Sequence, residues 1–387
     1  MMRSRAPVWT AGAAFAVAIL FAASAEAAPD PKAVADLLVA DFAATGKATA
    51  TYESATADGD TVTITGFMAT QTERKGRTMG AATIVASGVA DRQPGGYTAQ
   101  RVTVTDGSMS YRGNTLSFRS GVIDNVVLIT PDEIPKLSAN YNPFTQAEVT
   151  GIAFSGPELK EPLNIDHVRL TSTVDGEGQP THFQMDVGGI AIPASAIDSP
   201  EAQGVLQGLG YSDLVAAVAV DLDFDPAADL LTINAMTLDV ADVGKLTIAG
   251  KLSRAKVRAM LASETKDGAG PAAKPVSPKL ERLSIRIDNA GVVERALDMQ
   301  AQLLGTTRED IAQQWPMLLM FQMGDTGGMD FQMKLQEAVA TFLQSPKSLT
   351  VTLSPKEPVA LDELEQVLAH DESKATELLG VDVVANQ

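Results

Sequence analysis

The chain contains no cysteine, and this absence removes several kinds of site at once. Without a thiol there is no disulfide framework, no thiolate zinc site and no cysteine nucleophile. An acylated cysteine anchor of the lipoprotein type is excluded for the same reason. The fold must therefore depend on its hydrophobic core, which a chain of 387 residues with 45% hydrophobic side chains can supply.

Basic side chains are also few, with 30 Lys and Arg against 48 Asp and Glu and a formal net charge of −18. Proteins that bind nucleic acid need a basic surface to neutralise phosphates. An acidic chain is likewise repelled from an anionic membrane surface. We therefore expect no nucleic-acid partner and no flat docking on anionic lipid.

Long hydrophobic runs are absent except at the N-terminus. Two arginines precede an apolar stretch over residues 6–23, and Ala25 and Ala27 are the small residues that a signal peptidase reads. The densely apolar part is rich in alanine and shorter than the about 20 residues of a spanning helix. The pattern predicts a signal peptide over residues 1–27, cleaved before Ala28. The mature protein is then expected to be periplasmic, soluble and without stable membrane insertion, the alternative being an uncleaved anchor.

Residues 28–262 are predicted to form a β-rich domain. An amphipathic helix over residues 31–45 opens it. Beyond it, apolar and polar residues alternate in short segments, with a phase slip at Gly66 and a hairpin turn at Gly113-Asn114. The strands are expected at 61–67, 97–105, 121–130, 148–154, 165–174 and 182–187, and the hairpin at 108–118.

The clearest strand pattern covers residues 214–252, where short turns join three alternating segments. The first segment places Val218, Val220, Leu222 and Phe224 on one face and acidic residues on the other. In the second, the parity of the apolar positions changes between Ile233 and Met236, which predicts a β-bulge. The segment therefore predicts an antiparallel meander with one face in water.

Residues 263–278 are rich in glycine, proline and alanine and are predicted to be a linker or long loop. A smaller, helix-rich α+β region is expected over residues 279–387. Its helices are predicted at 292–304, 306–323 with a kink at Pro316, 329–343 and 361–370, and its strands at 283–287 and 349–353. The fold class is thus α+β, with a mainly antiparallel β body built from amphipathic strands and meanders. The alternative to a separate domain is a long loop within one continuous sheet.

Catalytic motifs are missing. The sequence has no nucleophile elbow, no H-E-x-x-H, no P-loop and no dinucleotide fingerprint. We therefore assign no catalytic residue and no cofactor. A pair of carboxylates brought together by folding would leave no local motif, so a hydrolase of that kind stays open.

Two groups of polar residues could hold a metal ion. His167 and His182 would come close if their strands formed a hairpin, although no third ligand is evident and solvent-facing histidines are the simpler interpretation. Asp221, Asp223 and Asp225 match the first ligands of a calcium loop. Pro226 replaces the glycine that such a loop needs, so alternation along a strand explains the acids better. No metal site is predicted.

Methionines concentrate in one C-terminal segment, which is the least usual local feature of the sequence. Three interpretations stand: a buried helix, an adaptable apolar binding surface, or a copper(I) site. If the segment is buried, all its methionines should be inaccessible. If it is a surface, Leu318 and Leu319 should take the core positions. The candidate ligand-binding residues are Met317, Met320, Phe321, Met323, Met329 and Met333.

Residues 205–387 contain stretches that resemble uncharacterised exported proteins of alphaproteobacteria. The stretches are Leu209-Gly-Tyr-Ser-Asp-Leu214, Val243-Gly-Lys-Leu-Thr-Ile248, Asp288-Asn-Ala-Gly291, Phe342-Leu-Gln-Ser-Pro346 and Leu349-Thr-Val-Thr-Leu353. The resemblance implies an envelope location and a shared fold, and no reaction. The layout of tandem amphipathic strands is also similar to AsmA-like envelope proteins, which are associated with lipid handling, although a cleaved signal departs from their usual membrane anchor.

These observations favour a non-enzymatic protein of the cell envelope. It is expected to bind a lipid-like or other apolar ligand, or an envelope partner protein. The alternatives are the carboxylate-based hydrolase and a purely structural periplasmic protein.

Overall fold

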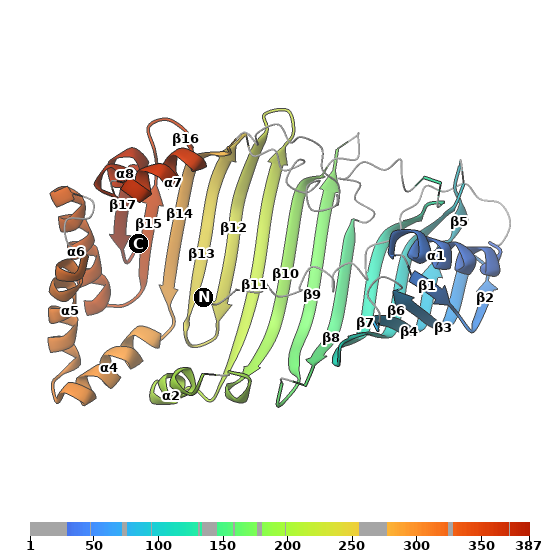
Figure 1. Cartoon of the computed structure of the whole chain (residues 1–387), viewed down its shortest axis with the longest axis horizontal. Coiled ribbons are helices and arrows are strands. Elements are labelled where there is room, and N and C mark those ends of the chain that lie inside the picture. Colours follow the sequence, from blue (N-terminus) through green and yellow to red (C-terminus); the bar gives the residue numbers. More distant parts are fainter. Residues whose placement is uncertain are drawn as a thin grey trace. The chain divides into compact units, whose positions relative to one another are not determined.

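The computed structural model describes residues 29–387 except 47, 72–75, 94, 131, 134–144, 158, 176–179, 198, 255–276, 324–327 and 371. The predicted signal peptide lies outside the described residues. Most of the described chain is antiparallel sheet, and several helices lie toward the C-terminus, so the predicted α+β class is confirmed (Figure 1). None of the helices in these described segments is both long and apolar enough to cross a membrane.

The chain divides into two compact units. Residues up to 180, with 185–190, belong to unit 1, and residues 181–184, with 191–387, form unit 2. Strand β10 (Pro180–Pro193) supplies residues to both.

Unit 1 begins with the predicted helix, α1 (Pro31–Gly46), and continues as an antiparallel sheet. Strand β3 pairs with β1, β2 and β4, and the order then runs through β6, β7, β8 and β9. A short strand, β5, pairs with the start of β6. The strands are β1 (Ala48–Thr51), β2 (Ser54–Asp58), β3 (Thr61–Gln71), β4 (Thr78–Ser87), β5 (Ala90–Asp91), β6 (Tyr97–Tyr111), β7 (Asn114–Leu128), β8 (Gln146–Ser155) and β9 (Leu163–Val174).

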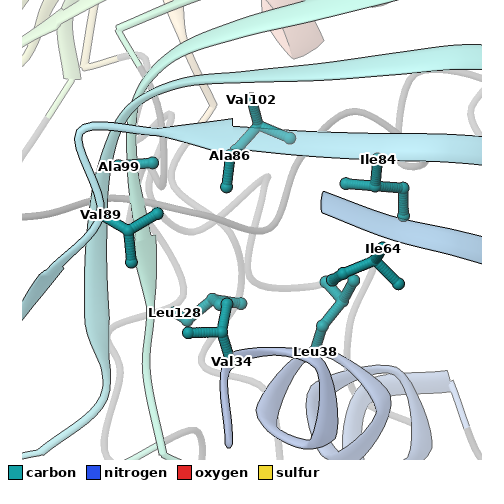
Figure 2. Close-up of a pocket in the computed structure, with 9 residues that line it drawn as sticks. All are labelled: Val34, Leu38, Ile64, Ile84, Ala86, Val89, Ala99, Val102 and Leu128. Carbon is teal, nitrogen blue, oxygen red and sulfur yellow. The ribbon is translucent and has the colours of Figure 1, made fainter. Parts of the chain in front are cut away.

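The core of unit 1 lies between α1 and this sheet. Val34 and Leu38 of α1 are buried and face Ile64, Ile84 and Leu128 of the strands (Figure 2). A gap of only about 20 Å³ remains between them, lined entirely by aliphatic side chains. Because that volume is on the scale of one water molecule, the gap belongs to the core and is too small for a ligand.

The β6–β7 hairpin turns one residue earlier than predicted. Arg112 and Gly113, with φ of 52° and 83°, form the turn, and Asn114 already pairs with Tyr111. A tight two-residue turn of this hand needs positive φ at both central positions. The sequence therefore identifies the hairpin correctly but places its turn one position late.

The phase slip at Gly66 is confirmed. Val62 and Ile64 are buried before it and Phe67 and Ala69 after it, and Gly66 itself has a left-handed φ of 62°. The strand pairing nevertheless keeps one register on both sides. The left-handed backbone of Gly66 thus changes which side chains face the core, while the pairing with β4 keeps its register.

Unit 2 contains the predicted meander and the helix-rich C-terminal region. Its strands pair antiparallel in the order β11, β12, β13, β14, β15 and β17, and the short β16 pairs with β14. The strands are β11 (Asp213–Asp225), β12 (Leu230–Val240), β13 (Gly244–Ser253), β14 (Lys279–Asn289), β15 (Ser348–Leu353), β16 (Val359–Ala360) and β17 (Val381–Ala385). The helices are a 3₁₀ turn η4 (Ala194–Ala196), α2 (Pro200–Gly208), α4 (Val292–Leu304), α5 (Arg308–Met323), α6 (Gly328–Gln344), α7 (Leu361–His370) and α8 (Glu372–Leu379).

The expected division into domains at residues 263–278 stays a prediction, because most of that segment lies outside the described residues. Strands β13 and β14, on its two sides, pair directly with each other. This pairing favours the alternative interpretation, in which the segment is a loop within one sheet.

Helices α4, α5 and α6 pack together at the β15–β17 end of unit 2 (Figure 1). Their shared core contains Leu297 and Ile311, each 1% exposed, together with Phe342. Leu349 of β15 and Ala385 of β17 pack against this cluster. The helices therefore cover the sheet face to which these two strand residues belong.

Candidate functional site: an exposed apolar sheet face

One face of strands β11–β14 carries only aliphatic, thioether and aromatic side chains and one glycine. The strand pairing aligns them into four rows that run across the strands, and we call these rows the apolar face. The rows are Val218, Leu238, Leu246 and Ile287; Val220, Met236, Ile248 and Ile285; Leu222, Ile233, Gly250 and Leu283; and Phe224, Leu231, Leu252 and Leu280.

This face is not covered as a core would be. Met236, Leu238 and Ile287 are 40%, 43% and 46% exposed, and of the four rows only Leu280 is buried. Soluble proteins rarely leave contiguous apolar surface of this extent in water unless it binds something. The apolar face is therefore the candidate binding site of unit 2.

The apolar face continues into the covered part of the sheet. Ile287 pairs with Leu349, and Leu349 pairs with Ala385, the two residues on which the helices pack. The helices thus bury one end of a surface that, over β11–β14, is half-buried or exposed except at Leu280. An apolar ligand on the open part would extend an existing core.

The opposite face of the same strands is polar and carries a hydrogen-bonded cluster. The side-chain amide of Asn234 donates to Asp221 Oδ1 at 2.8 Å and to Asp223 Oδ2 at 2.6 Å. His182 Nδ1 lies 2.7 Å from Asp223 Oδ1, and Gln184 Nε2 donates to Asp221 Oδ2 at 2.9 Å. Each carboxylate therefore has two hydrogen-bonding partners.

Hydrogen bonds from Asn234, and then from His182, hold the pKa of Asp223 below its ordinary value. A general acid needs the opposite shift, because it must keep its proton near neutral pH. The cluster also lies on an open strand face, where Asp223 is half exposed. Its carboxylates therefore act as structural acceptors and do not form an acid–base pair.

The calcium pattern at Asp221, Asp223 and Asp225 does not form a loop. Asp225 Oδ1 accepts from the backbone N–H groups of Ala227 and Ala228, at 2.9 Å and 3.0 Å, and so caps the β11–β12 turn. Within the described segments, no three His, Asp or Glu side chains are arranged to hold a metal ion. The acidic positions of Asp221, Asp223 and Asp225 follow from the alternation of apolar and polar residues along β11.

The predicted bulge between Ile233 and Met236 is confirmed, and it gives Asn234 its place. The strand register shifts there, so Asn234 is an extra residue on β12. Sequence reasoning identified the bulge but not the role of Asn234. The signal was present, since a single amide residue stands at the point where the apolar parity breaks.

The two strand histidines have separate carboxylate partners. His167 Nε2 lies 2.6 Å from Asp186 Oδ1 in unit 1, while His182 belongs to the cluster of unit 2. The ring of His167 lies over Gly188, where an added Cβ would come within 2.3 Å of Cε1. A side chain at position 188 would therefore displace the ring of His167 from this position.

The methionine segment forms parts of α5 and α6. Met317, Met329 and Met333 are 71%, 77% and 56% exposed, so the hypothesis that all five methionines are buried is wrong. The side chains of Met320, Phe321 and Met323 lie outside the described residues.

Under the surface hypothesis Leu318 was expected in the core; it is 55% exposed, so that part of the hypothesis is also wrong. The buried side of α5 is formed by Ile311, Ala312 and Pro316. Leu318 follows Pro316 by two residues, about 200° around a helix, and so points away from that side.

A second hollow, in unit 1, is wide open and mixed in character. About 360 Å³ in volume, it is lined by residues such as Leu37, Asp91, Arg92 and Tyr97. The Arg92 guanidinium is already bound to Glu133, with Nη1 at 3.0 Å and 2.9 Å from the two carboxylate oxygens. The Arg92 charge in this hollow is therefore already paired with a carboxylate of the same unit.

A family model described as an uncharacterized protein matches residues 237–386. This range runs from within β12 to the end of β17 and includes the β13 and β14 residues of the apolar face and, on β12, Leu238. The match agrees with the expected likeness to an uncharacterised family. No curated protein matches the chain.

Proposed function

We propose that this protein is a soluble, exported protein of the cell envelope that binds a lipid-like ligand on the apolar face of unit 2. The observation that carries the proposal is the exposure of Met236, Leu238 and Ile287 within otherwise hydrocarbon rows. Burying such surface releases about 25 cal/mol per Å².

The chemistry of the face favours a ligand with hydrocarbon chains. Its four rows present no hydrogen-bond donor or acceptor from a side chain. A polar ligand would therefore lose its hydration without compensation. A lipid-like molecule can instead bury its chains and keep its polar part in water.

Export follows from the expected signal peptide over residues 1–27. The likeness in layout to AsmA-like envelope proteins, which are associated with lipid handling, supports the same proposal. So does the net charge of −18, which keeps a protein with an apolar face away from anionic membrane surfaces.

A hydrolase is the weaker proposal. A hydrolase of this kind needs carboxylates that converge in a cleft. Asp221 and Asp223 do not meet this need, because their oxygens already accept hydrogen bonds from amide groups or lie beside an imidazole. The lowered pKa of Asp223 also opposes a role as general acid.

The proposal is tested with a neutral apolar dye, N-phenyl-1-naphthylamine, and two adjacent variants on β12. Leu238→Glu places a carboxylate on the apolar face, whereas Thr237→Glu places the same carboxylate on the polar face. We expect the wild type and Thr237→Glu to bind the dye alike, and Leu238→Glu to bind at least about tenfold more weakly, about 1.4 kcal/mol. Circular dichroism and thermal unfolding establish that both variants are folded.

Equal dye binding by Leu238→Glu and Thr237→Glu would place the ligand elsewhere and contradict the proposal. A second protein copy on the same face is another outcome. It would appear in analytical ultracentrifugation as a dimer that Leu238→Glu dissociates, and it would also contradict lipid binding.

A further inference from the structure

A second bulge, in β14, changes which side chains the polar face of unit 2 presents. Arg282 of β14 lies opposite Lys251 of β13, and the next pair on this face is Lys279 opposite Ser253. Two steps along β13 thus match three along β14, and Glu281 is the extra residue. In a regular strand, residues three apart point to opposite faces. The bulge therefore brings Lys279 and Arg282 onto one face, beside Lys251.

We call Lys251, Lys279 and Arg282 the basic patch. Lys251 and Arg282 are exposed and Lys279 is half-buried. Side chains that face each other across antiparallel strands have Cβ atoms about 5 Å apart, and like charges there destabilise the sheet. Within the described segments none of the three cations is within ion-pair distance of a carboxylate, whereas Arg286, also on β14, is bound to Asp288 at 2.7 Å. The basic patch is thus a local excess of positive charge in a chain of net charge −18.

Another lysine of the same strand and the same face has the opposite surroundings. Lys245 of β13 lies between Asp239 of β12 and Asp288 of β14. Lys251 instead lies between Thr232 of β12 and the cation of Arg282. The charge of Lys245 is therefore offset by its neighbours across the sheet, and the charge of Lys251 is reinforced by one of them.

We propose that the basic patch binds a phosphate group, either the free ion or a monoester. A guanidinium group can donate two parallel hydrogen bonds to two phosphate oxygens, and an ammonium group acts beside it as a point charge. A phosphate carries up to two negative charges and several strong acceptor oxygens, so one group can serve all three cations. Bound phosphate turns the repulsion between Lys251 and Arg282 into attraction to a shared anion.

This site is separate from the proposed lipid site, because the basic patch and the apolar face lie on opposite faces of β13 and β14. Its success or failure is therefore independent of the dye experiment.

The proposal is tested by isothermal titration calorimetry of the full chain with sodium phosphate at constant ionic strength. Arg282→Gln and Lys251→Gln should each weaken phosphate binding at least about tenfold, since each removes a charged hydrogen-bond donor. Lys245→Gln is the matched control, because it removes the same charge from the same strand and face. It should bind phosphate as the wild type does.

Thermal unfolding separates lost binding from lost folding. Without phosphate, Lys251→Gln should unfold at the wild-type temperature or above it, because one of two facing like charges is gone. Phosphate should raise the unfolding temperature of the wild type and of Lys245→Gln, but not that of Lys251→Gln. Sodium chloride of the same ionic strength should not produce this difference.

Glycerol phosphate, titrated in the same way, identifies the form of the ligand. Tighter binding of glycerol phosphate than of inorganic phosphate would assign a monoester, and the reverse order would assign the free ion. Three results would overturn the proposal. They are no phosphate binding by the wild type, equal weakening by Lys245→Gln and Arg282→Gln, and an equal thermal shift with chloride.

Discussion

Leu238 of β12 lies directly opposite Leu246 of β13, yet 43% of Leu238 remains exposed. In a protein core such a pair would be covered by a second layer. Among the described residues, the second layer formed by α4, α5 and α6 lies at the β15–β17 end of unit 2, and Met236, Leu238 and Ile287 on strands β12 and β14 are exposed.

The exposure of Leu238 predicts a small effect on stability. Leu297→Ala, in the helix core, should lower the free energy of unfolding by ~2–5 kcal/mol through the cavity it leaves. Leu238→Ala should cost less, about 1 kcal/mol in the absence of ligand, because nearly half of Leu238 is already in water. Denaturant unfolding measures both. An equal loss in the two variants would mean that the apolar face is covered.

The cluster around Asp223 predicts a pH-dependent contribution to stability. Because hydrogen bonds from Asn234 and His182 lower the folded-state pKa of Asp223, this carboxylate stabilises the fold above its unfolded pKa of about 3.9. The contribution is lost as pH falls through the lower folded pKa. The stability difference between wild type and Asp223→Asn should therefore be larger at pH 6 than at pH 3.

Asn234→Ala is the matching variant, since it removes the largest cause of that shift. It should reduce the pH dependence that Asp223 contributes, as measured by urea unfolding across the same pH range. A pH profile that Asn234→Ala leaves unchanged would contradict the assigned hydrogen bonds.

Two glycines of unit 1 form a matched pair for backbone strain. Gly96 and Gly76 have φ of 91° and 87°, but an added Cβ would lie 2.1 Å from the carbonyl oxygen of Leu128 at Gly96 and meets nothing within 4 Å at Gly76. Gly76→Ala should cost about 1–3 kcal/mol from its backbone conformation alone. Gly96→Ala should cost more, since the strand backbone cannot move aside as a side chain can. Thermal unfolding compares them, and equal losses would contradict the close approach to Leu128.

The exposed methionines of α5 and α6 should be the first to oxidise. Under mild peroxide, Met317, Met329 and Met333 should form sulfoxide before Met109, whose sulfur is 3.1 Å from Arg77 Nη2. Peptide mass spectrometry over a time course gives the order. Early oxidation of Met109 would contradict the described exposures.

Local sequence patterns predicted much of the fold because they report which face of an element is apolar. This kind of pattern predicted the helix at residues 31–45, the phase slip at Gly66 and the bulge before Met236. Helix α2 was missed although Ser199 caps it and Pro200 stands in its first turn, a recognisable start signal. Strand β4 was missed because alanine and glycine weaken its alternation.

The candidate site was less accessible to sequence reasoning. The parity of Val218 to Phe224 shows that one face of β11 is apolar, but whether helices cover that face depends on tertiary packing. The methionine segment was chosen as a candidate site because its composition is unusual. The apolar face consists of residues that are common in strands, so its composition gives no such signal. The partners of Asn234 likewise come from strands far apart in the sequence.

The most direct test of the central claim is photo-crosslinking in cells that produce the protein. p-Benzoylphenylalanine is placed at position 238 on the apolar face or at position 237 on the polar face, and adducts are identified by mass spectrometry of the purified protein. Lipid-sized adducts at 238 and their absence at 237 are the predicted result. Equal adducts at both positions, or none at 238, would contradict lipid binding on this face.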